Sequence, residues 1–160
     1  MSASTQKISA TAQKISARLN AVQAVYQMTI NEQDAKSTTR EYLEHRAGMT
    51  VDDETFVQPD QALLSGIIQG VDAKVNDLRE IVHKNLNAKD DKTTLKTAKS
   101  VEPLLESILL CGVYEIMNHD DIDAPIIIND YIEIADSFYD SSAKKLVNAV
   151  LDNVTKLVRN

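Results

Sequence analysis

Apolar side chains recur at steps of three and four along most of the sequence, which is the spacing that one face of an α-helix requires. The clearest stripe lies near the N-terminus and consists of Ile8, Ala12, Ile15, Leu19, Val22 and Tyr26. This stripe predicts a long first helix with Ser4 or Thr5 as its N-terminal cap. We find no strand pair, internal repeat or low-complexity tract, and the sequence therefore predicts an all-α fold.

The same spacing predicts five further helices. Their expected caps or first-turn residues are Ser37 or Thr38, Pro59, Pro103, Asp123, and the serines at 141 and 142. The run of Ile126, Ile127 and Ile128 alone would also suit a strand, but the later spacing Ile128, Ile132, Ala135 favours a helix. The helix that starts at Pro59 extends through Val82, and we expect its Gly66 and Gly70 to permit a close neighbour.

Residues 84–100 lose the apolar period and gather five lysines. We therefore divide the 160 residues into an N-terminal helical subdomain, 1–86, a polar connecting segment, 87–100, and a C-terminal helical subdomain, 101–160. Two small helical bundles packed together are the expected architecture.

The sequence lacks the usual signatures of catalysis and metal binding. It has no cysteine pair at zinc spacing, no Gly-rich phosphate loop and no nucleophile elbow, so we expect no enzyme and no cofactor. His45, His83 and His119 are expected to be solvated or structurally bonded, and "HDDID" (119–123) to be a solvated turn that caps the next helix. The sole cysteine, Cys111, lies in an apolar stretch and is expected to be buried. A reducing, cytoplasmic location without a membrane span is the corresponding prediction.

Charge is unevenly distributed in a chain whose net charge is -7. No Asp or Glu precedes Glu32, whereas seven carboxylates and no Lys or Arg lie between residues 119 and 140. Steps of seven and four place Lys7, Lys14 and Arg18 on one face of the first helix, which could follow a phosphate backbone. The alternative is that these cations only solubilise the helix, because nucleic-acid-binding domains usually carry a larger basic patch.

Four blocks resemble one family. "ARLNAVQAVYQM" (17–28) is similar to the opening helix of the NusB family of bacterial transcription antitermination factors, with its pattern A-R-x-x-A-V-Q-A-L-Y. "GVYEI" (112–116), "IINDYIEIADSF" (127–138) and "KKLVNAVLDNV" (144–154) are similar, in order and spacing, to the family blocks L-Y-E-L, I-N-E-x-I-E-x-A-K-x-F and K-F-V-N-G-V-L-D.

This resemblance implies an RNA-binding adaptor without catalysis. NusB-like proteins pair with NusE, a small-subunit ribosomal protein, on the boxA element of ribosomal RNA leaders, and act with the transcription elongation complex. The RNA-binding residues that it implies are Lys14, Arg18, Ser142 and Lys144. The cationic face of the first helix adds Lys7 to this RNA-binding set, together with the nearby hydrogen-bonding side chain of Gln23. Tyr26 and Leu105 fall near the surface that would face NusE.

Some positions depart from the family pattern. Ile15 and Ser16 stand where the family is often basic, and Leu110 stands where an Arg is usual. We therefore expect RNA binding to depend on NusE. Two alternatives stay open: a paralogue that keeps a protein partner but has lost RNA, and a detached module like that preceding ribosomal-RNA cytosine methyltransferases. A homodimer is also open, because the family is known to self-associate.

Overall fold

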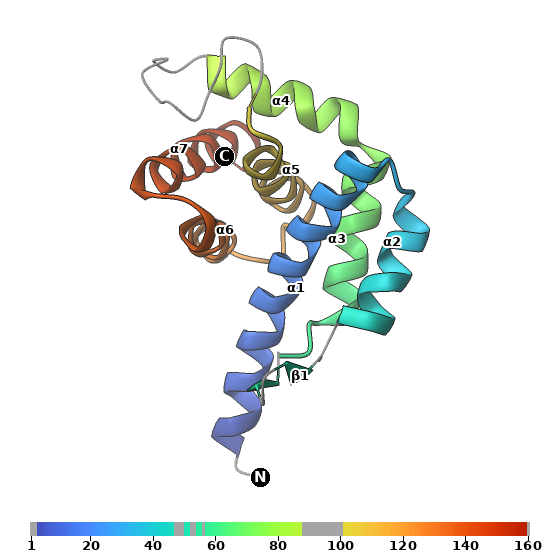
Figure 1. Ribbon diagram of the computed structural model, residues 1–160. Coiled ribbons are helices and arrows are strands. Elements are labelled where there is room, and N and C mark those ends of the chain that lie inside the picture. The colour runs from blue at the N-terminus through green and yellow to red at the C-terminus, as the bar shows by residue number, and fades with distance from the viewer. Residues whose placement is uncertain (1–2, 47–49, 52–53, 56, 88–100, 160) are drawn as a thin grey trace. The chain divides into compact units, whose positions relative to one another are not determined.

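The computed structural model describes residues 3–46, 50–51, 54–55, 57–87 and 101–159 (Figure 1), and side chains only outside 3–9, 45–46, 50–51, 54–55 and 87. Its helices are α1 Ala3–Asn31, α2 Ala35–Glu41, the π-helical turn η1 Tyr42–Arg46, α3 Gln61–Ala73, α4 Val75–Asn87, α5 Pro103–Asn118, α6 Ala124–Phe138 and α7 Ser141–Val158. The all-α class is confirmed, including the helix over the isoleucine run.

One prediction about the loop after α2 is wrong. Residues Thr50–Val51 (β1) and Glu54–Thr55 (β2) form a two-stranded antiparallel ladder, in which Thr50 pairs with Thr55 and Val51 with Glu54. Each strand has only two residues, so alternation of apolar and polar side chains, which needs about four residues to be visible, could not reveal it.

The helix expected from Pro59 through Val82 is in fact two helices, with a break at Lys74. Neither a proline nor a glycine occupies position 74, and Leu64, Val71, Leu78 and Val82 are all buried along one continuous stripe. Local sequence therefore carried no stop signal. The break lies beside the point where the chain divides into two compact units, Met1–Asp72 (unit 1) and Ala73–Asn160 (unit 2).

This division falls earlier than we predicted from the lysine-rich segment. Helix α4, which we assigned to the N-terminal subdomain 1–86, belongs to unit 2, where it packs against α5 and α7. Helix α4 belongs to unit 2 because its apolar face is buried against helices of that unit. Residues 88–100, most of the predicted connecting segment, lie outside the described residues.

In unit 1, α1 packs against α2, and side-chain amides tie the helices together. The Gln27 amide donates from Nε2 to Oε2 of Glu41 over 3.1 Å, and its Oε1 accepts from the Tyr42 hydroxyl over 3.2 Å. Gln69 of α3 donates to Oγ1 of Thr39 in α2 over 3.1 Å. Helix α1 ends at Asn31, and the next residue, Glu32, has a φ of 53° and turns the chain toward α2.

In unit 2, α5, α6 and α7 pack side by side and appear almost end-on in Figure 1. Helix α5 is buried on nearly all sides, as predicted, and includes Cys111. Gly112 allows a close approach of α7, because a Cβ built there would lie 2.9 Å from both methyl carbons of Leu151. By contrast a Cβ at Gly66 would meet nothing within 4 Å, so our expectation for Gly66 is wrong.

Aspartates, rather than the expected residues, cap three helices. Asp34 accepts from the Ser37 N–H over 2.7 Å at the start of α2, and Asp60 accepts from the Leu63 N–H over 3.0 Å at the start of α3. Asp140 caps α7 in place of a serine. A carboxylate directly before the first helical residue satisfies free N–H groups and also suits the positive end of the helix dipole.

Candidate RNA interface

The N-terminal part of α1, before its first buried residue Ala17, carries exposed side chains. Ala10, Thr11 and Lys14 are exposed. On another side of the helix the chain before α3 crosses α1, where the Ser16 hydroxyl donates to the Val57 carbonyl over 2.8 Å. Lys14 therefore presents its ammonium group to solvent. The side chain of Lys7, one of the predicted contacts, lies outside the described residues.

Arg18 does not lie on this exposed face. Its side chain is 1% exposed, and it is not an unpaired charge. The helical steps correctly placed Arg18 in line with Lys14, but α1 is buried at Ala17, Arg18, Ala21 and Val22. A buried guanidinium keeps its hydrogen bonds with protein groups, which favours a role for Arg18 in stabilising the fold over direct contact with a phosphate.

Farther along α1, Gln23 and Tyr26 are half-buried. Tyr26 is adjacent to Gln27, whose amide holds α1 to Tyr42 and Glu41. The backbone around Tyr26 is therefore fixed by contacts within unit 1. Its half-exposed side chain remains available to a partner, and so does the Gln23 amide.

In unit 2 the predicted contacts occupy the first turn of α7. The Ser142 hydroxyl donates to Oδ1 of Asp140 over 2.6 Å, and the Ser142 N–H donates to the same atom over 3.1 Å. These two bonds, the hydroxyl first, lower the pKa of Asp140 below its ordinary value of 3.8. The Ser142 hydroxyl is therefore engaged by the capping Asp140, and Lys144 pairs with Asp136 of α6 over 3.5 Å.

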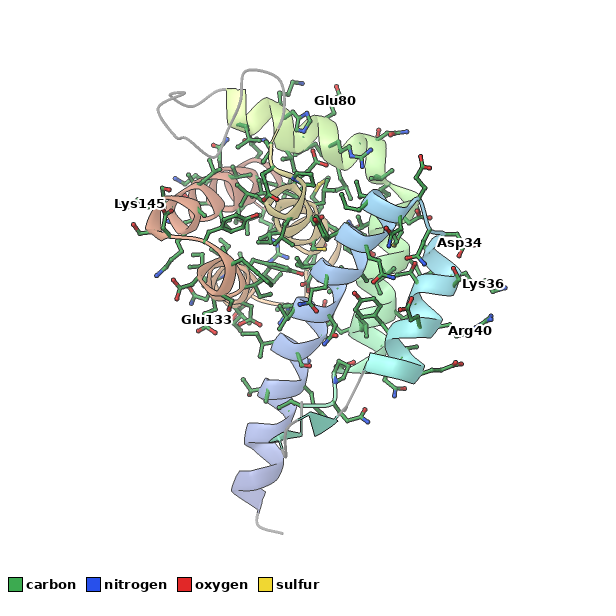
Figure 2. The ribbon with its side chains drawn as sticks, viewed as in Figure 1. Asp34, Lys36, Arg40, Glu80, Glu133 and Lys145 are labelled. Carbon is green, nitrogen blue, oxygen red and sulfur yellow. The ribbon has the colours of Figure 1, made fainter. Side chains whose placement is uncertain are left out.

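A cation that we did not single out lies next to these residues. Lys145 is exposed and projects outward from the start of α7 (Figure 2). Because Lys144 is half-buried and faces a carboxylate, Lys145 is the more accessible positive charge of this turn. The signal for it was the Lys-Lys pair itself, but only the structure shows which lysine faces solvent.

The comparisons with known proteins agree on one family. The NusB family model matches residues 15–156. The transcription antitermination protein NusB of Sinorhizobium medicae is 37% identical over 147 residues, which cover 92% of this chain and 88% of that protein. The protein of the same name from Bartonella tribocorum is 34% identical over 143 residues, covering 89% and 88%.

The chain belongs to the NusB family. A solved structure of T. maritima NusB has the same fold, with a TM-score of 0.68 at 20% identity, and covers 89% of each chain. The family model begins at Ile15, so Lys7 and Lys14 lie ahead of the matched residues. Arg18, Gln23 and the first turn of α7 lie within them.

Leu105, predicted near the partner surface of this NusB-family chain, is 0% exposed. It follows Pro103 in the first turn of α5, and its N–H donates to the Glu102 carboxylate over 3.3 Å. Its side chain is a core residue and cannot contact a partner in this conformation. Leu110, which stands where the family usually has Arg, is 1% exposed and fills the same core.

Two histidines of this NusB-family chain lie beside glutamate carboxylates. Nε2 of His83 in α4 lies 2.8 Å from Oε2 of Glu106 in α5, and Nδ1 of His119 lies 2.8 Å from Oε1 of Glu115. Both histidines are thus structurally bonded, whereas the side chain of His45 is not described.

Among the described residues, no group of three or more His, Cys, Asp or Glu side chains could hold a metal ion, and no helix is long and apolar enough to cross a membrane.

Proposed function

We propose that the protein is an RNA-binding adaptor of transcription antitermination, which pairs with NusE on boxA-type RNA of ribosomal RNA leaders and joins the transcription elongation complex. The observation that carries this proposal is the family match over residues 15–156, together with relatives that are named transcription antitermination proteins. The acid-free sequence before Glu32 adds an electrostatic reason, since RNA phosphates attract such a segment.

Within this proposal Lys14 is the principal phosphate contact of α1, with Lys7 ahead of it on the same helical face. Gln23 supplies a hydrogen-bonding amide, and the first turn of α7 contributes Ser142 and Lys144. Tyr26 contacts NusE. Arg18 supports the RNA-facing helix indirectly, because its guanidinium is buried.

So few exposed cations predict weak RNA binding by this chain alone. Each phosphate contact contributes modestly, and salt weakens it because the counterions released on binding gain less entropy in a more concentrated salt solution. Pairing with NusE would add contacts on the same RNA and convert weak binding into stable binding.

The test is a titration of fluorescently labelled boxA RNA with the purified protein, in the presence and absence of NusE, at physiological salt. We expect tight binding only with NusE, and loss of binding when the boxA sequence is scrambled. Equal binding of boxA and the scrambled RNA by the pair would overturn the proposal.

A second candidate is a paralogue that keeps the protein partner but has lost RNA. The specific observation in its favour is the burial of Arg18, which removes one of the three cations expected on the RNA face. The same titration separates the two candidates. A protein that forms a complex with NusE and leaves the affinity of NusE for boxA unchanged would be this paralogue.

A further inference from the structure

Exposed apolar side chains concentrate at one end of unit 2. The large hydrophobic residues that are exposed in the described part of the chain are Ile30, Val57, Met117, Ile126, Phe138, Leu157 and Val158. Four of them, Met117, Ile126, Leu157 and Val158, belong to the end where α5 and α7 finish and α6 begins, which we call the apolar end. Single exposed apolar residues are ordinary, whereas several at one place mark interaction surfaces.

Arg159 holds the apolar end together. Its guanidinium donates from Nε to the Ile116 carbonyl over 2.9 Å, from Nη1 to the Ile122 carbonyl over 2.7 Å and from Nη2 to the His119 carbonyl over 2.8 Å. The last turn of α7 is therefore fixed beside the end of α5 and the turn that follows it. Leu157 and Val158, which immediately precede Arg159, are held in place by the same bonds.

The apolar stripe of α7 continues into this last turn without a cover. Val147, Leu151 and Val154 are buried, and Leu157 and Val158 follow Val154 at steps of three and four. They thus extend the face that packs on the other helices, yet Leu157 is 68% exposed and Val158 45%. Apolar side chains that continue a core-facing stripe but remain uncovered are suited to contact with a second polypeptide.

Charge indicates which kind of polypeptide. Asp120, Asp121 and Asp123 are exposed in the turn between α5 and α6, within a stretch that has no Lys or Arg from residue 119 to 140. The cations that the described structure places near this end are engaged. Arg159 donates to the carbonyls named above, Lys156 pairs with Asp152 over 3.1 Å, and Lys74 donates to Oδ1 of Asn118 over 2.8 Å. The apolar end therefore combines uncovered apolar side chains with negative charge.

We propose that the apolar end of unit 2 is a docking surface for a basic amphipathic helix of another protein. Leu157, Val158 and Met117 would contact the apolar face of that helix, and Asp120, Asp121 and Asp123 its flanking Lys or Arg side chains. Within unit 2 this surface is separate from the RNA contacts proposed above, because those lie in the first turn of α7 and this surface includes its last turn.

The probe is a labelled helical peptide of Leu and Lys, with roughly 18 residues, so that its leucines line one face over five helical turns. A scrambled peptide of the same composition, which cannot form that face, is the control ligand. We expect the helical peptide to bind the full chain at least about tenfold more tightly than the scrambled one. Amide resonances of residues 117–126 and 154–159 should shift, and binding should weaken as salt rises.

Matched variants test the location. Leu157→Ser and Asp121→Asn should each weaken peptide binding several-fold, whereas Ile30→Ser and Glu32→Gln, which change exposed residues of unit 1, should leave it unchanged. Equal effects in both pairs, or resonance shifts confined to other residues, would overturn the proposal. It would also be overturned if the protein self-associated in sedimentation without peptide and Leu157→Ser abolished this, because the occupant would then be a second copy.

Discussion

The Tyr131 hydroxyl of α6 donates to Oε2 of Glu115 in α5 over 2.6 Å, and both side chains are 0% exposed. The same carboxylate lies beside the His119 ring, so a buried charge is held by groups from two helices. Removal of one donor leaves part of that charge without a hydrogen bond, which is costlier than the bond itself.

Tyr131→Phe should therefore lower the free energy of unfolding by about 1–3 kcal/mol, measured by urea denaturation. Tyr139→Phe is the matched control. The Tyr139 hydroxyl also donates to a glutamate, Glu102, but this pair is exposed to solvent and its loss should cost less than about 1 kcal/mol. Equal losses in both variants would contradict the role of burial.

Arg18→Ala should lower the stability of the protein, whereas Lys14→Ala should weaken its RNA binding. Loss of the buried Arg18 guanidinium should reduce stability by about 2 kcal/mol or more and lower the thermal midpoint by several degrees. Lys14→Ala should change stability by less than about 0.5 kcal/mol, but weaken boxA binding by the complex with NusE and reduce its salt slope by about 1. If Arg18→Ala instead weakened RNA binding at an unchanged midpoint, our assignment of Arg18 would be wrong.

Gly112→Ala should destabilise the protein by about 1–3 kcal/mol, because the new Cβ overlaps the methyl groups of the buried Leu151. This cost outweighs the gain of up to about 1 kcal/mol from the higher helix propensity of Ala. Gly66→Ala, also within a helix but with open space at its Cβ, should realise that gain and stabilise the protein. Chemical denaturation should therefore give a lower free energy of unfolding for Gly112→Ala and a higher one for Gly66→Ala.

The Asp140 cap predicts a dependence of stability on pH. Its carboxyl has a lowered pKa in the folded protein, so the capping contribution is present above the ordinary value of 3.8 and is lost as pH falls through the lower, folded-state pKa. Asp140→Ala should therefore be less stable than the wild type at pH 7. The difference between the two should shrink as pH falls below 3.8, measured by urea denaturation at each pH.

Cys111 should resist thiol reagents in the native state. Burial raises the pKa of its thiol well above 9.0, and the nearby Glu115 carboxylate adds to this shift, so the reactive thiolate is scarce as well as inaccessible. Labelling should proceed only at the rate at which the protein opens, and denaturant should accelerate it. Rapid labelling of the folded protein would contradict the burial of α5.

The sequence predicted much of the helical core because helix spacing is a local property. The buried α5, the helix over 124–138 and the stripe of α7 through Val154 all follow from apolar residues at steps of three and four. Asp123 caps α6 and Pro103 begins α5 as predicted, whereas the caps of α2 and α7 were displaced by one to three residues, because serines and aspartates compete for the same N–H groups. At Asp140 and Asp34 the carboxylate took them and the serine bonded to the carboxylate.

The sequence by itself determined the fold class, the family and which residues could form helices, since these depend on local spacing and on ordered motifs. Only the tertiary structure decided that Arg18 is covered while Lys14 is exposed, that Leu105 belongs to the core, that Lys145 is more accessible than Lys144, and that the helix breaks at Lys74. The physical reason is that periodicity defines a face of a helix, but burial depends on which other segments, distant in the sequence, pack against that face and where along the helix they end.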